Sequence, residues 1–152
     1  MQNLPDILLD EVMRNQYLTF EVNGEDYGVE IAYVKEIVKM HKITKVPDMP
    51  SFIEGLINLR GELIGVLDVR KRFGMPQVEH DEETCIIVII YDDYKLGMII
   101  DRVLETVTIE NSMVSAPPDA KLSYANQFIR NIGTVGTDVK LLIDVERFLS
   151  QD

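Results

Sequence analysis

One stretch of this chain is written nearly twice, and this repeat constrains the possible folds more than any other feature. A shift of 76 positions, from Phe52 to Phe128, lays residues 52–69 over residues 128–145. The matching residues are Phe52, Ile53, Leu56, Leu67, Asp68 and Val69 in the first copy and Phe128, Ile129, Ile132, Ile143, Asp144 and Val145 in the second. Both copies keep the residues that form a core, so we expect two similar halves. The copy breaks at one charged residue, because Arg60-Gly61 falls on Gly136-Thr137.

An earlier segment is echoed as well. From Tyr17 the side chains alternate between apolar and polar, and Asn23-Gly24 can supply the positive φ angles of a tight turn, which predicts a β-hairpin. A shift of 69 positions lays this hairpin over a second one. Gly28, Ile31, Val34, Glu36 and Val38 then fall on Gly97, Ile100, Val103, Glu105 and Val107, and the turn falls on Asp92-Asp93. Similarity between two Val/Ile-rich hairpins can arise by chance, but two successive echoes in the same order favour a repeat.

Each copy is therefore predicted to contain a hairpin, a short helical turn, a strand, a proline loop and a strand pair that ends in Asp. Many short strands separated by turn signals indicate an all-β protein of small barrels or a sandwich. The two halves are expected at roughly 17–76 and 84–150, within a domain of residues 14–150. A half of this size would bury only about 60% of its surface and would be marginally stable alone, so the halves are expected to share a core. Residues 1–13 form an N-terminal tail, either frayed or a small docking helix.

The charge and cysteine content narrow the choice of partners. A net charge of -11 would repel a phosphate backbone and an anionic membrane, which disfavours nucleic acid and lipid surfaces as partners. The single cysteine, Cys85, begins an apolar run to Tyr91 that is typical of a buried strand and fits a reducing cytoplasm. That run is shorter than the roughly 20 residues that cross a bilayer, and the N-terminus lacks the features of a signal peptide. We expect a cytoplasmic protein that does not insert into membranes and binds proteins or small ligands.

Nothing in the sequence predicts catalysis, a cofactor or a metal. His41 and His80 have no neighbouring ligand at metal-binding spacing, and no phosphate-binding loop or nucleophile motif is present. Asp68, Asp101 and Asp144 each end an apolar run, which leaves a small acidic enzyme as the rival from a different class. The favoured interpretation is structural, because Asp68 and Asp144 each precede a short helical segment and can cap it.

Arg60 is the first candidate for function. An arginine in a turn is usually solvated, and its replacement usually changes stability by no more than about 0.5 kcal/mol. Arg60 is a stronger candidate than most turn arginines because the other copy of the repeat has no charged residue at this position. A guanidinium can hold a carboxylate or backbone oxygens at an interface. The seam between the halves is the second candidate. Val29, Ile31, Val34 and Val103 form a stripe there that is either core or an open groove able to hold a helix.

The segment around Arg60 resembles the CheW-like family of bacterial chemotaxis coupling proteins. The resemblance runs from about Tyr17 to Leu149 and departs from the family at Gly65, where proline is common. The residues that carry the resemblance are Asn58-Leu59-Arg60-Gly61, Val66-Leu67-Asp68-Val69-Arg70, Arg72-Phe73-Gly74, Tyr27-Gly28-Val29-Glu30-Ile31, Val34-Lys35-Glu36-Ile37, Pro50-Ser51-Phe52-Ile53-Glu54-Gly55, Gly97-Met98-Ile99-Ile100-Asp101-Arg102-Val103 and Leu142-Ile143-Asp144-Val145-Glu146.

The resemblance implies two intertwined five-stranded SH3-like β-barrels that share a hydrophobic core. It also implies a non-catalytic adaptor between the cytoplasmic tips of chemoreceptors and the regulatory domain of the histidine kinase CheA. On this basis the partner-binding residues are Arg60 and Glu36, with Asn58 and Gly61 in the same turn. Val34, Ile37 and Val103 are expected near the receptor groove. A specialised paralogue of another motility system, or a fragment of a coupling protein fused to a receiver domain, remains the alternative within the family.

Overall fold

The strands of this protein form two sheets, and each sheet is assembled from both halves of the sequence. The computed structural model describes residues 14–117 and 125–150. One sheet has the order β8-β1-β2-β11-β10-β9 and the other has the order β3-β6-β7-β5-β4. The strands are β1 (Gln16–Val22), β2 (Glu25–Glu30), β3 (Val34–Lys39), β4 (Ile53–Leu59), β5 (Glu62–Asp68), β6 (Cys85–Tyr91), β7 (Tyr94–Ile100), β8 (Arg102–Thr108), β9 (Val114–Ser115), β10 (Ile129–Val135) and β11 (Asp138–Ile143).

The helices in the described part of the chain are single turns. They are α2 (Val69–Arg72), α3 (Val145–Leu149) and 3-10 turns at Ile31–Tyr33, Asn111–Met113 and Ala125–Phe128. None of them could span a bilayer. The helical turn predicted after each hairpin forms only in the first copy, as Ile31–Tyr33, because a single bend at Asp101 joins β7 to β8 in the second copy.

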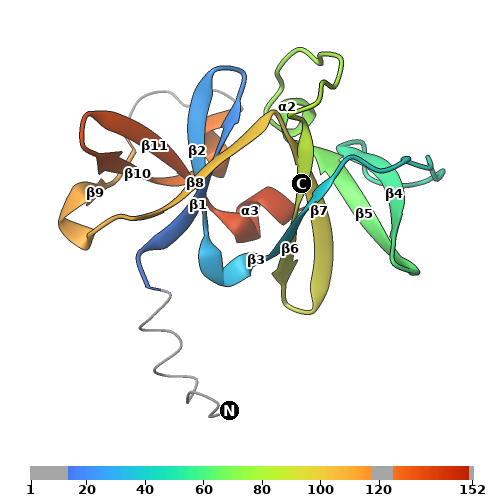
Figure 1. Ribbon diagram of the computed structural model, residues 1–152, viewed down its shortest axis with the longest axis horizontal. Coiled ribbons are helices and arrows are strands. Elements are labelled where there is room, and N and C mark those ends of the chain that lie inside the picture. The colour runs from blue at the N-terminus through green and yellow to red at the C-terminus, as the bar shows by residue number, and fades with distance from the viewer. Residues whose placement is uncertain (1–13, 118–124, 151–152) are drawn as a thin grey trace, which may run out of the picture.

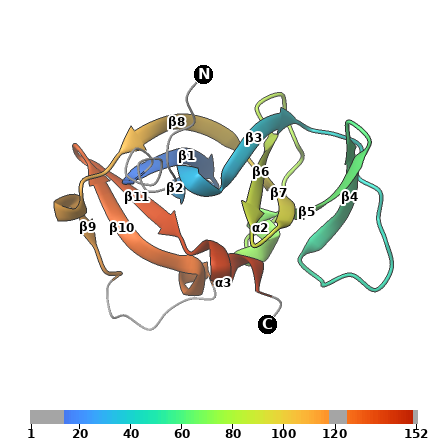
Figure 2. The same ribbon diagram turned by 90° about the horizontal axis from the view of Figure 1, so that it is seen from below.

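The two halves exchange their hairpins. Hairpin β1–β2 joins β8–β11 from the second half, and hairpin β6–β7 joins β3–β5 from the first, so the sheets form two lobes with α3 between them (Figures 1 and 2). The repeat therefore persists in three dimensions, because residues matched by the two shifts occupy the same place in the order of the two sheets. The all-β class and the intertwined barrels predicted from the sequence are confirmed. The two-residue strand β9 adds a sixth strand to one sheet, where the other sheet has only a bridge between Thr44 and Leu56.

Each exchanged hairpin is joined to its new sheet by a short parallel pairing, β2 with β11 and β7 with β5. An ion pair accompanies each junction. Lys140 Nζ lies 2.7 Å from Asp26 Oδ2 at the first, and Lys95 Nζ lies 2.9 Å from Glu62 Oε1 at the second. Asp26 and Lys95 correspond in the repeat, whereas their partners Lys140 and Glu62 do not, so each junction has an ion pair of its own.

The hairpin turns form as predicted. Asn23 and Gly24 have φ angles of 55° and 80°, and their counterparts Asp92 and Asp93 have 48° and 69°. Both turns therefore have two central residues with positive φ, the geometry that matches the twist of hairpin strands.

Of the two buried hydrophobic clusters among the described residues, one lies where the two barrels meet, and the other, which includes Ile57, Ile64 and Ile86, lies within the β3–β7 barrel. The first is the shared core. Its buried residues come from both sheets and from both short α-helices. Strand β1 is buried on both faces, since Leu18 and Phe20 belong to this core while Thr19, on the opposite face, bonds through its hydroxyl to the backbone of Glu105. Alternation alone predicts a polar, solvent-facing position at Thr19, and the closure of the barrel buries it instead.

Arg72 lies in the middle of the shared core and is only 2% exposed. Its guanidinium carbon is 4.0 Å from the ring centroid of Phe52 and 4.5 Å from that of Phe128, the two phenylalanines related by the repeat. The guanidinium donates to the carbonyl oxygens of Phe148 and Ser150, at the C-terminal end of α3. A cation at that end satisfies carbonyl groups that the helix itself cannot pair. Arg72 thus joins α2 of one half to α3 of the other.

Gly28 and Gly97, which correspond in the repeat, are both required by close packing. A Cβ atom at Gly28 would lie 2.9 Å from Leu142 Cδ2, and one at Gly97 would lie 2.8 Å from Val66 Cγ1. Val66 and Leu142 also correspond in the repeat, so the same contact recurs in both barrels.

We predict that Gly97→Ala lowers the free energy of unfolding by about 1–3 kcal/mol, because the added methyl group overpacks a fully buried site. Gly65→Ala is the matched control on the adjacent strand, since its Cβ would meet only Leu96 Cδ1 at an ordinary 3.5 Å. Urea denaturation of both variants measures the difference. Equal stability of the two variants would contradict the packing explanation.

Candidate functional site

The candidate site is built on the turn between β4 and β5. Arg60 and Gly61 occupy the turn with φ angles of 53° and 90°, and the side-chain oxygen of Asn58 accepts a hydrogen bond of 2.8 Å from the Gly61 N–H. Glycine is required at position 61 because of the positive φ angle. A side chain would not clash there, since a Cβ atom would meet nothing within 4 Å. The sequence Asn-Leu-Arg-Gly therefore makes a closed turn that holds Arg60 at the end of the hairpin.

Arg60 has a backbone conformation that an arginine rarely adopts. The left-handed region costs a non-glycine residue roughly 1–2 kcal/mol. Its counterpart in the repeat, Gly136, has nearly the same φ of 62°, and glycine adopts it without strain. Two turns that correspond in the repeat thus carry glycine at this position in one barrel and a strained arginine in the other. They differ at the next residue, where Gly61 has a φ of 90° and Thr137 has no positive φ. Strain of this kind is found where a side chain is retained for its function.

Arg60 pairs with Glu36, the other charged residue that the family resemblance implied as partner-binding. Arg60 Nη2 lies 2.6 Å from Glu36 Oε2, and the two side chains are 65% and 25% exposed. An ion pair this exposed stabilises the fold by no more than about 1 kcal/mol. The pair orients the guanidinium across β3 and β4 and leaves most of it open to solvent.

The remaining predicted residues lie on two strands that correspond in the repeat. Val34 begins β3 and Val103 lies near the start of β8, and both are half-buried against the shared core. Ile37 lies on the other face of β3 from Glu36 and is 44% exposed. The structure thus brings Arg60, Glu36, Asn58 and Gly61 together, whereas Val34 and Val103 lie against the core and Ile37 faces solvent. Val29, considered for the groove, is fully buried in the core.

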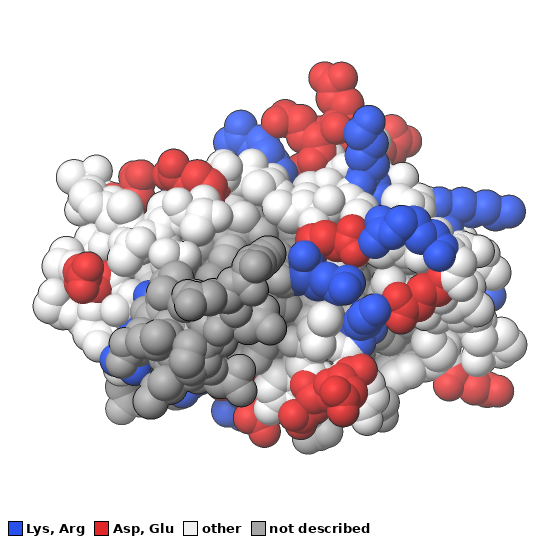
Figure 3. Space-filling view, turned by 60° about the horizontal axis from the view of Figure 1, so that its bottom comes forward, with Lys and Arg blue, Asp and Glu red and all other residues white. Residues whose placement is uncertain are grey.

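The exposed face of β3 is basic although the protein as a whole is acidic. Lys35 and Lys39 flank Ile37 on this face, and Lys42 is exposed just after the strand. Figure 3 shows Lys and Arg side chains gathered over the half of the molecule formed by β3–β7, with acidic side chains between them. The exposed face of β3 around Ile37 therefore differs in sign from the protein's net charge.

The three aspartates considered for catalysis have separate structural roles. Asp68 accepts a hydrogen bond from the Arg70 N–H and Asp144 accepts one from the Arg147 N–H, so each caps the helix that follows it, as predicted. Burial, and secondarily the charge of Glu54, raises the pKa of the Asp68 carboxyl, although the hydrogen bond from the Arg70 N–H acts to lower it. Within residues 14–117 and 125–150, no group of three or more His, Cys, Asp or Glu residues is placed to hold a metal ion.

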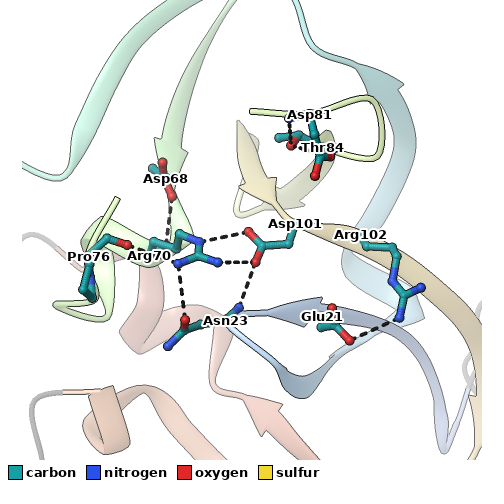
Figure 4. A network of polar contacts seen from close by, with 9 residues as sticks. All are labelled: Glu21, Asn23, Asp68, Arg70, Pro76, Asp81, Thr84, Asp101 and Arg102. Atoms are coloured by element: carbon teal, nitrogen blue, oxygen red, sulfur yellow. Dashed lines mark hydrogen bonds and ion pairs between the residues drawn. The ribbon is translucent and has the colours of Figure 1, made fainter. Parts of the chain in front are cut away.

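Asp101 is the centre of a polar network that the sequence did not reveal (Figure 4). Arg70, in α2, donates from Nε and Nη2 to both oxygens of Asp101 at 3.0 and 2.6 Å, and the Asn23 N–H donates to the same carboxylate at 2.8 Å. Asp101 lies between β7 and β8, so the network ties the β1–β2 turn to α2 of the other sheet. Burial acts to raise the pKa of the Asp101 carboxyl, but the hydrogen bonds and charge of Arg70 and the hydrogen bond from the Asn23 N–H outweigh it and hold the pKa below its ordinary value.

These features define an all-β double-barrel domain, and in this chain a strained, ion-paired arginine lies at one of its hairpins. The chain belongs to the CheW-like domain family, whose model matches residues 16–152.

Individual relatives agree with this assignment. A protein named chemotaxis protein CheW from Bacillus subtilis (strain 168) is 33% identical over 135 residues, which are 89% of this chain and 86% of that protein. A chemotaxis protein CheW from Treponema pallidum (strain Nichols) is 31% identical over 139 residues, covering 89% of this chain and 82% of that protein. The crystal structure of the scaffolding protein TtCheW from Thermoanaerobacter tengcongensis superposes with a TM-score of 0.78 at 34% identity, covering 86% of this chain and 88% of that one.

We predict that Arg60→Gly does not destabilise the protein and raises the free energy of unfolding by up to about 1 kcal/mol. Glycine relieves the left-handed strain, and its greater freedom in the unfolded chain offsets part of that gain. Thermal and urea unfolding measure the change, with Gly136→Ala as the inverse control that introduces strain at the corresponding position. A clear loss of stability in Arg60→Gly would show that the arginine is retained for folding.

We predict that Asp101→Asn lowers the free energy of unfolding by about 1–3 kcal/mol near neutral pH, because Arg70 loses a charged partner. The folded-state pKa of Asp101 lies below the unfolded value of about 3.9, so its stabilisation is present above that pH and is lost as the pH falls through the folded-state pKa. The gap between wild type and variant is therefore expected to narrow below about pH 4. Urea unfolding at a series of pH values tests this, and a gap independent of pH would contradict it.

Proposed function

We propose that this protein is a cytoplasmic, non-catalytic chemotaxis adaptor that couples the cytoplasmic tips of chemoreceptors to the regulatory domain of the histidine kinase CheA. Membership of the CheW-like family supports the role in chemotaxis, and the similarity to a scaffolding protein supports a role in assembly. The observation that carries the proposal is Arg60, which is exposed, ion-paired with Glu36 and held in a strained turn where the other barrel has glycine.

The contact surface would centre on the guanidinium of Arg60. The guanidinium can donate hydrogen bonds from its free side to a carboxylate or to backbone oxygens of a partner. Its ion pair with Glu36 fixes the direction of the guanidinium. The exposed Ile37 and the half-buried Val34 and Val103 would supply apolar contact with a receptor helix. Each such contact would contribute roughly 1.5–3 kcal/mol when fully covered, before the costs of association, which suits reversible assembly.

We predict that Arg60→Ala weakens binding to a receptor-tip fragment or to the kinase regulatory domain by at least about tenfold, as expected for an arginine at the centre of an interface. Circular dichroism and melting are expected to stay close to wild type, because the ion pair is exposed. Calorimetry with fragments from the same cell measures the affinities, and backbone NMR shifts locate the contact.

Lys71→Ala is the matched control, because Lys71 is also exposed and ion-paired, with Glu54 at 3.3 Å. The double variant Arg60→Glu with Glu36→Arg keeps the pair and exchanges its ends, so it separates a need for the pair from a need for the guanidinium at this turn. Unaltered binding of Arg60→Ala to both partners would refute the proposed site.

A further inference from the structure

An apolar groove lies on the surface beside α3, and none of the residues of the turn that carries Arg60 lines it. We call it the Gly65 groove; it has a volume of about 590 Å³. Gly65 is among its lining residues, with the apolar side chains of Met49, Phe52, Ile53, Leu56, Leu96 and Leu149. Tyr94 also lines it and is 71% exposed. Grooves of this size and composition hold ligands or the anchoring side chains of a partner.

The groove exists because one barrel lacks side chains that fill the same place in the other. Gly65 pairs with Leu96 across the β5–β7 junction, and the corresponding pair at the β11–β2 junction is Leu141 with Tyr27. The counterpart of Leu149 is Phe73, whose ring lies 5.1 Å from that of Tyr27. Both of these aromatic residues are 3% exposed. Smaller residues at three corresponding positions therefore leave the groove open in one barrel only.

A charged pocket adjoins the groove and shares Tyr91 and Glu146 with it. We call this the Tyr33 pocket; it has a volume of about 220 Å³. Its charged lining consists of the carboxylates Glu30, Asp144 and Glu146 and the guanidinium of Arg130. No ion pair within 4.0 Å involves any of these three carboxylates in residues 14–117 and 125–150.

The raised pKa values of Tyr33 and Tyr91 are consistent with negative charge in the pocket. Burial and then the charge of Glu30 raise the pKa of Tyr33, Arg130 acts to lower it, and Asp144 and Glu146 raise it further. Burial and then Glu146 raise the pKa of Tyr91. The two rings lie 5.8 Å apart and offer aromatic faces to a cation next to the carboxylates.

We propose that the Gly65 groove and the Tyr33 pocket together bind a partner segment in which two or three large apolar side chains are followed closely by a lysine or arginine. The apolar side chains occupy the groove, and the cation lies against Glu30, Asp144 and Glu146. Because the two cavities share lining residues, the cation belongs within one helical turn of the last apolar anchor.

Charge distinguishes this occupant from two others. The chain's own residues 1–13 carry Asp6, Asp10 and Glu11 and would place carboxylates beside the carboxylates of the pocket. A second copy of the chain would bring a net charge of -11 against the same sign. A basic amphipathic segment meets three carboxylates against one guanidinium in the pocket and Lys95 in the groove, so the carboxylates outnumber the cations.

The test uses the full-length protein and two designed peptides of about 16 residues, long enough to form a helix on binding. Both carry leucines along one face. One carries lysines beside them, and the other carries glutamates at the same places. Calorimetry measures affinity and backbone NMR locates the contact. We expect the lysine peptide to bind, with shifts around Gly65, Tyr91 and Leu96 and weaker affinity at high salt.

Gly65→Leu is the decisive variant, because it installs the residue found at the corresponding position, Leu141, and the first added atom meets only Leu96 at 3.5 Å. It is expected to keep the fold and to weaken binding of the lysine peptide at least about tenfold. Glu146→Lys is expected to weaken it by a similar factor, whereas Glu110→Lys, the same charge change on the other lobe, is expected to have little effect.

The proposal is overturned if the glutamate peptide binds equally well, if neither peptide binds, or if Gly65→Leu folds and binds as wild type does. It is also overturned if the lysine peptide binds only after residues 1–13 are removed, which would identify that segment as the occupant. Self-association abolished by Gly65→Leu would identify a second copy. Binding of a receptor tip through Arg60 is expected to survive Gly65→Leu, so this proposal and the adaptor role succeed or fail separately.

Discussion

The buried guanidinium of Arg72 between Phe52 and Phe128 is the contact on which the rest of the structure depends. It lies in the core that the two halves share because they exchange hairpins. From α2, its guanidinium donates a hydrogen bond to a carbonyl group at the C-terminal end of α3. Arg72 is only 2% exposed. Replacing it with an uncharged residue would remove the cation from the two rings and its hydrogen bonds from the carbonyl groups of α3 inside the core. The exchange of strands explains why residues of both sheets meet in one core at the seam, while the β3–β7 barrel keeps a second, smaller cluster of its own.

Duplication with exchange also explains how a symmetric frame carries asymmetric surfaces. The packing positions recur, as shown by Gly28 with Leu142 and Gly97 with Val66, because any change there would overpack a barrel. Other positions, both exposed and buried, differ between the two barrels. The turns that correspond in the repeat carry Arg60 in one barrel and Gly136 in the other. The corresponding strand junctions are filled by Tyr27 in one barrel and left open beside Leu96 in the other.

The surfaces that result are suited to different partners. The Arg60 turn lies beside the basic face of β3, whereas the Gly65 groove leads into a pocket dominated by carboxylates. A small acidic protein thus presents local regions of opposite sign, which favour different partners and reduce competition between them. The Asp101 network holds the seam between the lobes and fixes how these regions are oriented relative to one another.

The sequence by itself determined the repeat, the hairpin turns, the aspartate caps and the candidacy of Arg60, because each depends on residues close in the chain or on a fixed shift along it. The same shift also places Arg70 on Glu146 and Arg72 on Phe148, so Arg60 is one of several charged differences between the copies, and the shift alone does not say which of them is exposed. Only the tertiary structure decided which hairpin joins which sheet, that Arg72 is buried while Arg60 is exposed, and that Glu36 lies 2.6 Å from Arg60. These outcomes depend on contacts between segments far apart in the chain, and local periodicity carries no information about which distant strand will complete a barrel.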